Sequence, residues 1–180
     1  MYFDRTGKIN TQKTADLALQ AARERGIGHI VIASNSGESA KILAGKGPKI
    51  VCVTQVYGFS EKGKNAMLAE TMASLTAEGI QIVTASHVLS GVERSLSTVF
   101  GGVYPAEIMA HTLRMFGQGT KVAVEVAVMA LDAGLIPFGE RIISIGGTGR
   151  GADTALIMTP SHAQYVLETR IHEFICKPGI

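Results

Sequence analysis

Residues 29–39 read His-Ile-Val-Ile-Ala-Ser-Asn-Ser-Gly-Glu-Ser, a short apolar run followed at once by a polar loop. The β-branched run 29–33 is typical of a buried strand that is covered on both faces. The segment 38–44 places Ala40 and Leu43 on one side of a helix. This stretch therefore predicts a strand, a loop and a helix in direct succession, the unit from which parallel α/β sheets are built.

Units of the same kind lie on both sides of this stretch. Upstream, residues 11–25 carry apolar residues at helical spacing, and Gly26 is a plausible C-terminal stop. Downstream come a buried strand at 50–54, a helix at 65–78 and a third strand at 80–84. This alternation predicts right-handed crossovers and a parallel sheet.

The second half of the chain has a different pattern. Residues 92–133 are largely helical in pattern, and Pro105 is well placed to open one helix. Two more strands are expected at 141–145 and 154–158. The link between them, 146–153, is too short for a helical crossover, so the last strand should run antiparallel to its neighbour. We therefore expect a single three-layer α/β/α domain with a mostly parallel sheet.

Composition limits the classes of function. The 180 residues are 46% apolar and 18% charged, and the formal net charge is +2. This balance gives no general attraction to nucleic acid or to a membrane surface, and we expect neither as a partner. The amino terminus lacks a secretory signal, and Glu125 and Asp132 interrupt the most apolar segment. We therefore expect a cytoplasmic protein.

No residue pattern predicts a metal site or a serine nucleophile. The two cysteines, Cys52 and Cys176, lie far apart, and the five histidines are scattered. Cys52 sits in an apolar run and is interpreted as a small core residue. No serine lies in a nucleophile-elbow sequence.

The polar loop at 34–39 is the strongest candidate site. Backbone N–H groups at the start of a helix are unpaired, and such a cluster can bind phosphate without a lysine or arginine. The alternative is simple N-capping, but one cap needs one such residue and the loop offers several. The predicted contacts of this loop are Ser34, Asn35, Ser36, Gly37 and Ser39.

The glycine-rich link 146–153 is the second candidate. Its backbone amides could meet a flavin ring edge, and Arg150 could neutralise phosphate; alternatively, a glycine-rich hairpin turn needs no ligand. The predicted contacts are Gly146, Gly147, Thr148, Gly149, Arg150, Asp153 and Thr154.

Isolated polar residues near the expected strand ends are weaker candidates. His87 could act as an acid or base, or bond only to backbone. Arg94 could clamp an anion or form a surface ion pair. Thr54 and Gln55 could line the cleft, and Tyr57 could stack on a ring or pack on its own loop.

Two later stripes carry charged residues along helices. Glu125 falls near the boundary between core and solvent, where it could assist a reaction. Lys121 lies four residues before it, so a helix-surface pair is the simpler interpretation. Glu107, His111 and Arg114 form a similar stripe, which is typical of a solvated face.

Residues 30–43, Ile-Val-Ile-Ala-Ser-Asn-Ser-Gly-Glu-Ser-Ala-Lys-Ile-Leu, resemble the strand, loop and helix of the pyruvate kinase C-terminal domain. In that family a Thr/Ser-x-Ser/Thr-Gly-x-Ser/Thr-Ala run holds the phosphate of a sugar effector. Residues 48–54 and 139–147 resemble its next strand and its last parallel strand with the glycine-rich turn. The kinase's barrel and catalytic residues have no counterpart here, so the resemblance does not imply kinase activity.

Over its whole length the chain is similar to stand-alone microbial proteins with this domain. They share a Thr-x-x-His-x-Leu-Ser-Gly-x-Glu-Arg segment, found here at 84–94. This resemblance suggests that flavin mononucleotide (FMN) can occupy their cleft. The family's sheet order is 3-2-1-4-5, with strand 5 antiparallel. Loops 34–39 and 146–153 would then meet at the switch point, where ligands of open α/β sheets bind.

The sequence therefore predicts a domain that binds a phosphorylated small molecule, with FMN as the first candidate. It leaves two roles open. The domain could be an enzyme acting on a phosphorylated metabolite or a flavin-dependent oxidoreductase, assisted by His87, Arg94 or Glu125. It could instead be a ligand-sensing module, which the lack of a clear nucleophile–base pair favours. The helices of the middle segment could serve a homo-oligomer interface.

Overall fold

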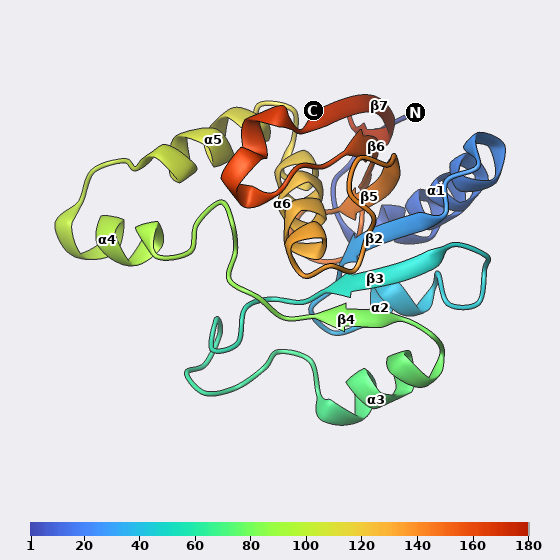
Figure 1. The fold of residues 1–180 in the computed structure, drawn as a ribbon, viewed down its shortest axis with the longest axis horizontal. Helices are drawn as coiled ribbons and strands as arrows, with labels where there is room; N and C mark the ends of the chain where they lie inside the picture. The colour runs from blue at the N-terminus through green and yellow to red at the C-terminus, as the bar shows by residue number, and fades with distance from the viewer. Residues whose placement is uncertain (180) are drawn as a thin grey trace.

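A single sheet runs through the computed structural model, which describes residues 1–179, and helices cover both of its faces (Figure 1). Its seven strands have the order β1-β7-β6-β5-β2-β3-β4. The strands are β1 (Tyr2–Phe3), β2 (His29–Ala33), β3 (Lys49–Val53), β4 (Gln81–Val83), β5 (Ile142–Gly146), β6 (Thr154–Thr159) and β7 (Arg170–Pro178). The helices are η1 (Lys8–Asn10), α1 (Thr11–Arg25), α2 (Glu38–Lys41), α3 (Ala69–Ala77), α4 (Glu93–Phe100), α5 (Pro105–Arg114), α6 (Gln118–Asp132) and η2 (Ala163–Glu168).

The α/β class is confirmed, and the five predicted strands correspond to β2 to β6. Their relative order, β4-β3-β2-β5-β6, is the expected 3-2-1-4-5. β2 pairs in parallel with both β3 and β5, whereas β6 runs antiparallel to β5. β2 and β5 are therefore neighbours, and the loops that leave them meet at one edge of the sheet.

The complete strand order differs from the predicted one because two further strands extend the sheet. β7 pairs antiparallel with β6, and β1 pairs in parallel with β7. The β6–β7 register shifts twice, which breaks the alternation of apolar and polar residues that predicts a strand. β1 is only two residues long, too short for any periodic signal.

The core is divided between the two faces of the sheet. One cluster joins α1, α2 and α3 to residues of one face, such as Ile30 and Ile143. The other joins α6 to the opposite face, where Val31 and Leu156 lie. α6 is buried on nearly every side because the sheet, α5 and η2 all pack against it. This burial agrees with a helix that is apolar almost all round.

The helices of the middle segment depart most from the body of the molecule. α5 begins at Pro105, as predicted. α4 and α5 project beyond the sheet, at the left of Figure 1. They are joined by polar contacts, because Glu93 accepts a hydrogen bond from the Ala106 N–H at 2.8 Å and Ser97 donates to Glu107 at 2.8 Å.

Candidate ligand-binding site

A cavity of about 630 Å³ lies at the carboxyl ends of β2 and β3, beside the first turns of α6. Its place is the switch point between β2 and β5, where ligands of open α/β sheets bind. The structure brings together both predicted loops there. The predicted residues that line the cavity are Ser34, Asn35, Ser36, Ser39, Thr54, Gln55, His87, Arg94, Glu125, Gly147, Gly149 and Arg150.

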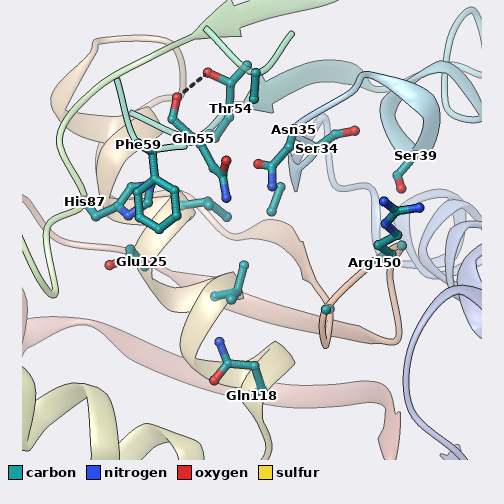
Figure 2. A pocket seen from close by; sticks show the side chains of 18 of the residues that line it. Ser34, Asn35, Ser39, Thr54, Gln55, Phe59, His87, Gln118, Glu125 and Arg150 are labelled. Atoms are coloured by element: carbon teal, nitrogen blue, oxygen red, sulfur yellow. Dashed lines mark hydrogen bonds between the residues drawn. The ribbon is translucent and has the colours of Figure 1, made fainter. Parts of the chain in front are cut away.

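Hydroxyl groups of the first loop are available to a ligand at one end of the cavity. Ser34, Ser36 and Ser39 form no side-chain hydrogen bond within residues 1–179, and no buried side-chain oxygen there lacks a partner. These hydroxyls must therefore reach the open space. Ser39 and Arg150 both line the cavity and are drawn on the same side of it in Figure 2. This end of the cavity combines donors with a positive charge.

The charged groups of the lining leave an excess of positive charge. The cavity is lined by five cationic side chains and two carboxylates: Lys8, Arg94, Arg114, Lys121 and Arg150 with Glu38 and Glu125. Lys8 pairs with Glu38 at 2.9 Å, and Lys121 pairs with Glu125 at 2.5 Å. The three arginines form no ion pair with any described residue. Five cations minus two carboxylates leave +3, more than the +2 of the whole chain, so the cavity attracts anions.

The Lys8–Glu38 pair stands at the exposed rim of this cavity. The hydrogen bond from Lys8 and its charge lower the pKa of the Glu38 carboxyl. Glu38 is therefore ionised at neutral pH, and Lys8 neutralises it. No sequence pattern pointed to Lys8, because it precedes α1 and is far along the chain from the loop that it faces.

Aromatic rings form the other end of the cavity. The rings of Phe59 and His87 are 5.3 Å apart and tilted by 44°, and the Arg94 guanidinium carbon lies 5.6 Å from the centre of the Phe59 ring. Tyr57 takes the alternative predicted for it: its hydroxyl donates to the Gly63 carbonyl of its own loop at 2.7 Å. Phe59, two residues further on, lines the cavity instead.

His87 is held by the backbone, as its alternative interpretation predicted. The Val56 N–H donates to His87 Nε2 at 3.4 Å, which leaves the ring proton on Nδ1. Burial lowers the pKa of His87, the charges of Lys121 and Arg94 lower it further, and Glu125 opposes them. His87 is therefore a neutral imidazole at pH 7, in contact with the aromatic end of the cavity.

Glu125 is not part of a helix-surface pair, and this prediction was wrong. Only 6% of its side chain and 8% of the Lys121 side chain are exposed. The Leu89 N–H donates to Glu125 Oε1 at 3.0 Å, while Lys121 donates to Oε2. The segment after β4 covers this side of α6, which no helical pattern could indicate. A buried ion pair therefore lies in the wall of the cavity.

Three amide side chains from different segments point into the middle of the cavity. They are Asn35 after β2, Gln55 after β3 and Gln118 at the start of α6 (Figure 2). Gln118 accepts a hydrogen bond from Arg114 at 2.8 Å, so its amide nitrogen remains able to donate. Sequence reasoning missed Gln118 and Phe59 and took Arg114 for a solvated residue. A single glutamine at the start of a helix belongs to no sequence motif that would indicate a binding residue.

Asp153 does not line the cavity, contrary to the prediction. Its side chain is fully buried, and one carboxylate oxygen accepts the N–H groups of Gly7 at 2.8 Å and Thr148 at 3.2 Å. The other oxygen accepts the Thr154 hydroxyl at 2.8 Å. Asp153 therefore braces the second loop from behind, and Thr148 and Thr154 serve the same purpose.

Two of the predicted glycines serve packing instead of lining the cavity. Gly37 has a φ of +85°, and a Cβ there would lie 2.9 Å from the Leu75 and Thr71 side chains of α3. A Cβ on Gly146 would clash with the Gly119 carbonyl where β5 passes the start of α6. The close approach of α6 to β5 therefore accounts for Gly146 without a ligand.

Membrane and metal features are absent from the part of the chain described. No helix within residues 1–179 is long and apolar enough to cross a bilayer. Over the same range, no three potential ligands among His, Cys, Asp and Glu gather at one point. Cys52 lies in the core, and burial raises the pKa of its thiol to about 12.

Comparison with known proteins identifies a family. The chain matches the family model described as "Pyruvate kinase, alpha/beta domain" over residues 12–158, most of its length. The structure is also similar to the crystal structure of a pyruvate kinase from Cryptosporidium parvum. The identity is 12% and the TM-score 0.40, and the match covers 82% of this chain and 22% of that one. The chain thus spans about a fifth of that kinase's length.

Proposed function

The chain belongs to the pyruvate kinase α/β-domain family, and from this premise we propose that its cavity binds a phosphorylated small molecule bearing an aromatic ring, with FMN as first candidate. One observation carries the proposal. Hydroxyls and Arg150 stand at one end of the cavity, and the rings of Phe59 and His87 stand at the other. A molecule with a phosphate at one end and a ring at the other matches this arrangement.

The phosphate end is suited to a doubly charged oxyanion. Ser34, Ser36 and Ser39 offer hydroxyl donors, and the guanidinium of Arg150 can form a charge-assisted bond. α2 has a single turn, so its dipole contributes little, and the side chains and the positive excess supply the attraction.

The ring end is suited to a flat heterocycle. A ring system could stack against Phe59, and the amides of Asn35, Gln55 and Gln118 could meet its donors and acceptors. The cavity volume of about 630 Å³ lies within the range common for cofactor sites. These residues therefore fit FMN, which would supply redox chemistry when bound. The chain's own residues would bind and orient it and exclude water.

Enzymatic action on such a phosphorylated metabolite is the second candidate, and one observation favours it over simple sensing. His87 is a neutral imidazole that lines the cavity together with the Lys121–Glu125 pair. As a neutral imidazole, His87 could accept a proton from a bound substrate at pH 7 through Nε2, once that nitrogen releases its long 3.4 Å contact with the Val56 N–H. Either role fits a cytoplasmic protein, the location expected from the sequence.

A titration with FMN and riboflavin tests the phosphate end and the ring end separately. We expect FMN fluorescence to be quenched on binding, with FMN bound at least tenfold more tightly than riboflavin. Arg150→Gln should weaken FMN binding about fivefold, which corresponds to about 1 kcal/mol for an exposed charge-assisted bond, and leave riboflavin unchanged. Arg141→Gln is the matched control, because Arg141 precedes β5 at the opposite end of that strand.

Two results would count against the proposal in different ways. Equal affinity for FMN and riboflavin would remove the phosphate site at residues 34–39. Unchanged fluorescence at saturating FMN would rule out FMN as the ligand. A thermal-shift screen of phosphorylated metabolites on the wild type and Arg150→Gln would then show whether any phosphate-bearing ligand depends on Arg150.

A further inference from the structure

The projecting arm, residues 92–116 with α4 and α5, exposes large apolar side chains to solvent. No residue of α4 is buried within the described structure. Phe100 is 76% exposed and Met115 82%. The apolar side chains of the arm that are more than half exposed include Val92, Val99, Phe100, Val103, Ile108 and Met115.

These side chains form stripes that the chain itself does not cover. Val92 at the N-cap of α4 and Leu96 and Val99 within it recur at intervals of four and three residues, which places them on one face. Glu93 and Ser97 occupy the side that bonds to the beginning of α5. The α4 stripe thus lies beside this polar contact, and its two valines, Val92 and Val99, remain largely exposed.

α5 has apolar residues on two sides. Ala110 is buried on the side towards α6, with which α5 packs. Ile108 and Met115 are seven residues apart and lie on the other side of the helix, exposed. A helix needs only one apolar side to dock on its own domain, so the second side calls for a further partner.

The total solvent-accessible surface of the chain indicates how much area a partner would cover. The solvent-accessible surface of folded monomers scales with their mass, and this relation gives about 8,400 Å² for a chain of 19.0 kDa. This chain exposes 9335 Å², roughly 900 Å² more than that scaling gives. A stable protein–protein interface buries about 800 Å² from each partner. The excess is comparable in size with the share that one subunit contributes to a standard interface.

The charges of the arm select among partners. Residues 92–116 contain two acidic side chains, Glu93 and Glu107, and two basic ones, Arg94 and Arg114, with no lysine. Helices that lie on anionic membranes are rich in Lys and Arg, which this arm is not. A patch of zero net charge does not repel an identical copy of itself, as a twofold interface requires.

From these observations we infer that the arm is the contact surface for a second copy of this chain. The apolar stripes of α4 and α5 pack against the same stripes of the partner in an isologous interface. This inference does not depend on the identity of the ligand or on any activity of the cavity.

Light scattering on the full chain after gel filtration tests the inference. The wild type should have about twice the monomer mass of 19.0 kDa. Val99→Glu and Phe100→Glu should each shift it to the monomer mass. Ile9→Glu is the matched control, because Ile9 is 75% exposed in η1, outside the arm, and this variant should keep the wild-type mass.

A monomeric wild type would overturn the inference, and so would an assembly that the arm variants leave intact. Binding of the monomer to anionic vesicles, lost in Phe100→Glu, would overturn it in favour of a membrane surface. If the arm variants fail to fold by circular dichroism, hydrogen exchange of the wild type decides. Amides of residues 92–116 should gain protection as protein concentration rises, and unchanged protection would refute the interface.

Discussion

The buried pair of Lys121 and Glu125 gives the sharpest test of the cavity wall. Glu125→Gln removes the negative charge but keeps an oxygen that can accept the Leu89 N–H. The ammonium group of Lys121 would then be left buried without its counter-ion. We expect a large loss of stability, because an uncompensated charge in the interior is far more costly than a broken surface pair.

The size of the loss follows from the burial of the two side chains. Removing one partner of a buried pair costs about 3–5 kcal/mol, and the position of this pair in the wall of an open cavity places it near the lower end, at about 3 kcal/mol. For a chain of this length that corresponds to a fall in Tm of about 6–12 °C. A helix-surface pair with the same spacing would give only about 0.3–0.5 kcal/mol.

Urea unfolding of Glu125→Gln, of the double variant Lys121→Met with Glu125→Gln, and of Glu61→Gln distinguishes a buried pair from a surface pair. Lys121→Met combined with Glu125→Gln should recover most of the lost stability, because neither charge then remains buried. Glu61→Gln is the matched control, because Glu61 pairs with Lys64 at 2.7 Å with both side chains largely exposed. If Glu125→Gln falls within about 0.5 kcal/mol of the wild type, the pair is solvated and the reasoning fails. A double variant no more stable than Glu125→Gln would refute it as well.

Two further changes test the loop and the imidazole. Gly37→Ala should destabilise the protein at least about 1 kcal/mol more than Gly45→Ala in urea unfolding. Both positions have positive φ, but only a Cβ on Gly37 meets the Leu75 and Thr71 side chains; equal losses would contradict this packing role. The lowered pKa of His87 means that the unfolded chain binds more protons, so stability falls as pH drops below about 6.5. On going from pH 7 to pH 5.5, the free energy of unfolding should therefore fall less in His87→Gln than in the wild type. The difference between the two slopes should be up to about 1.4 kcal/mol per pH unit. An identical pH dependence would rule out a buried neutral imidazole.

Local pattern was enough to predict most elements of the fold. The segments 29–33 and 141–145 are rich in isoleucine and valine, and each supplies most of a buried strand, β2 and β5. Thr11–Arg25 is helical over the whole predicted range, and the short link 146–153 correctly predicted an antiparallel last pair. The order of these strands followed from family resemblance, because pairing between strands leaves no periodic mark in one sequence.

The elements that were missed lacked such a pattern. β7 carries two register shifts and β1 has two residues, so neither shows a strand period. α2 ends at Lys41, before the predicted residue 44, because the N–H groups of Leu43 and Ala44 bond to carbonyls three residues back and the chain tightens into turns. These failures lie where hydrogen bonding to a neighbouring strand or packing against the sheet overrides local preference.

For the candidate site, the sequence by itself determined that two loops after strands are rich in hydroxyls and glycine, whereas their meeting at one edge of the sheet followed from the strand order. Only the tertiary structure decided which side chains share the cavity. It placed Lys8, Phe59 and Gln118 in the lining, turned Asp153 inward as a brace, and covered the Lys121–Glu125 pair with the segment after β4. Periodicity and turn residues report interactions within a few positions along the chain. A side chain's burial and partners are set by segments that lie tens of residues away.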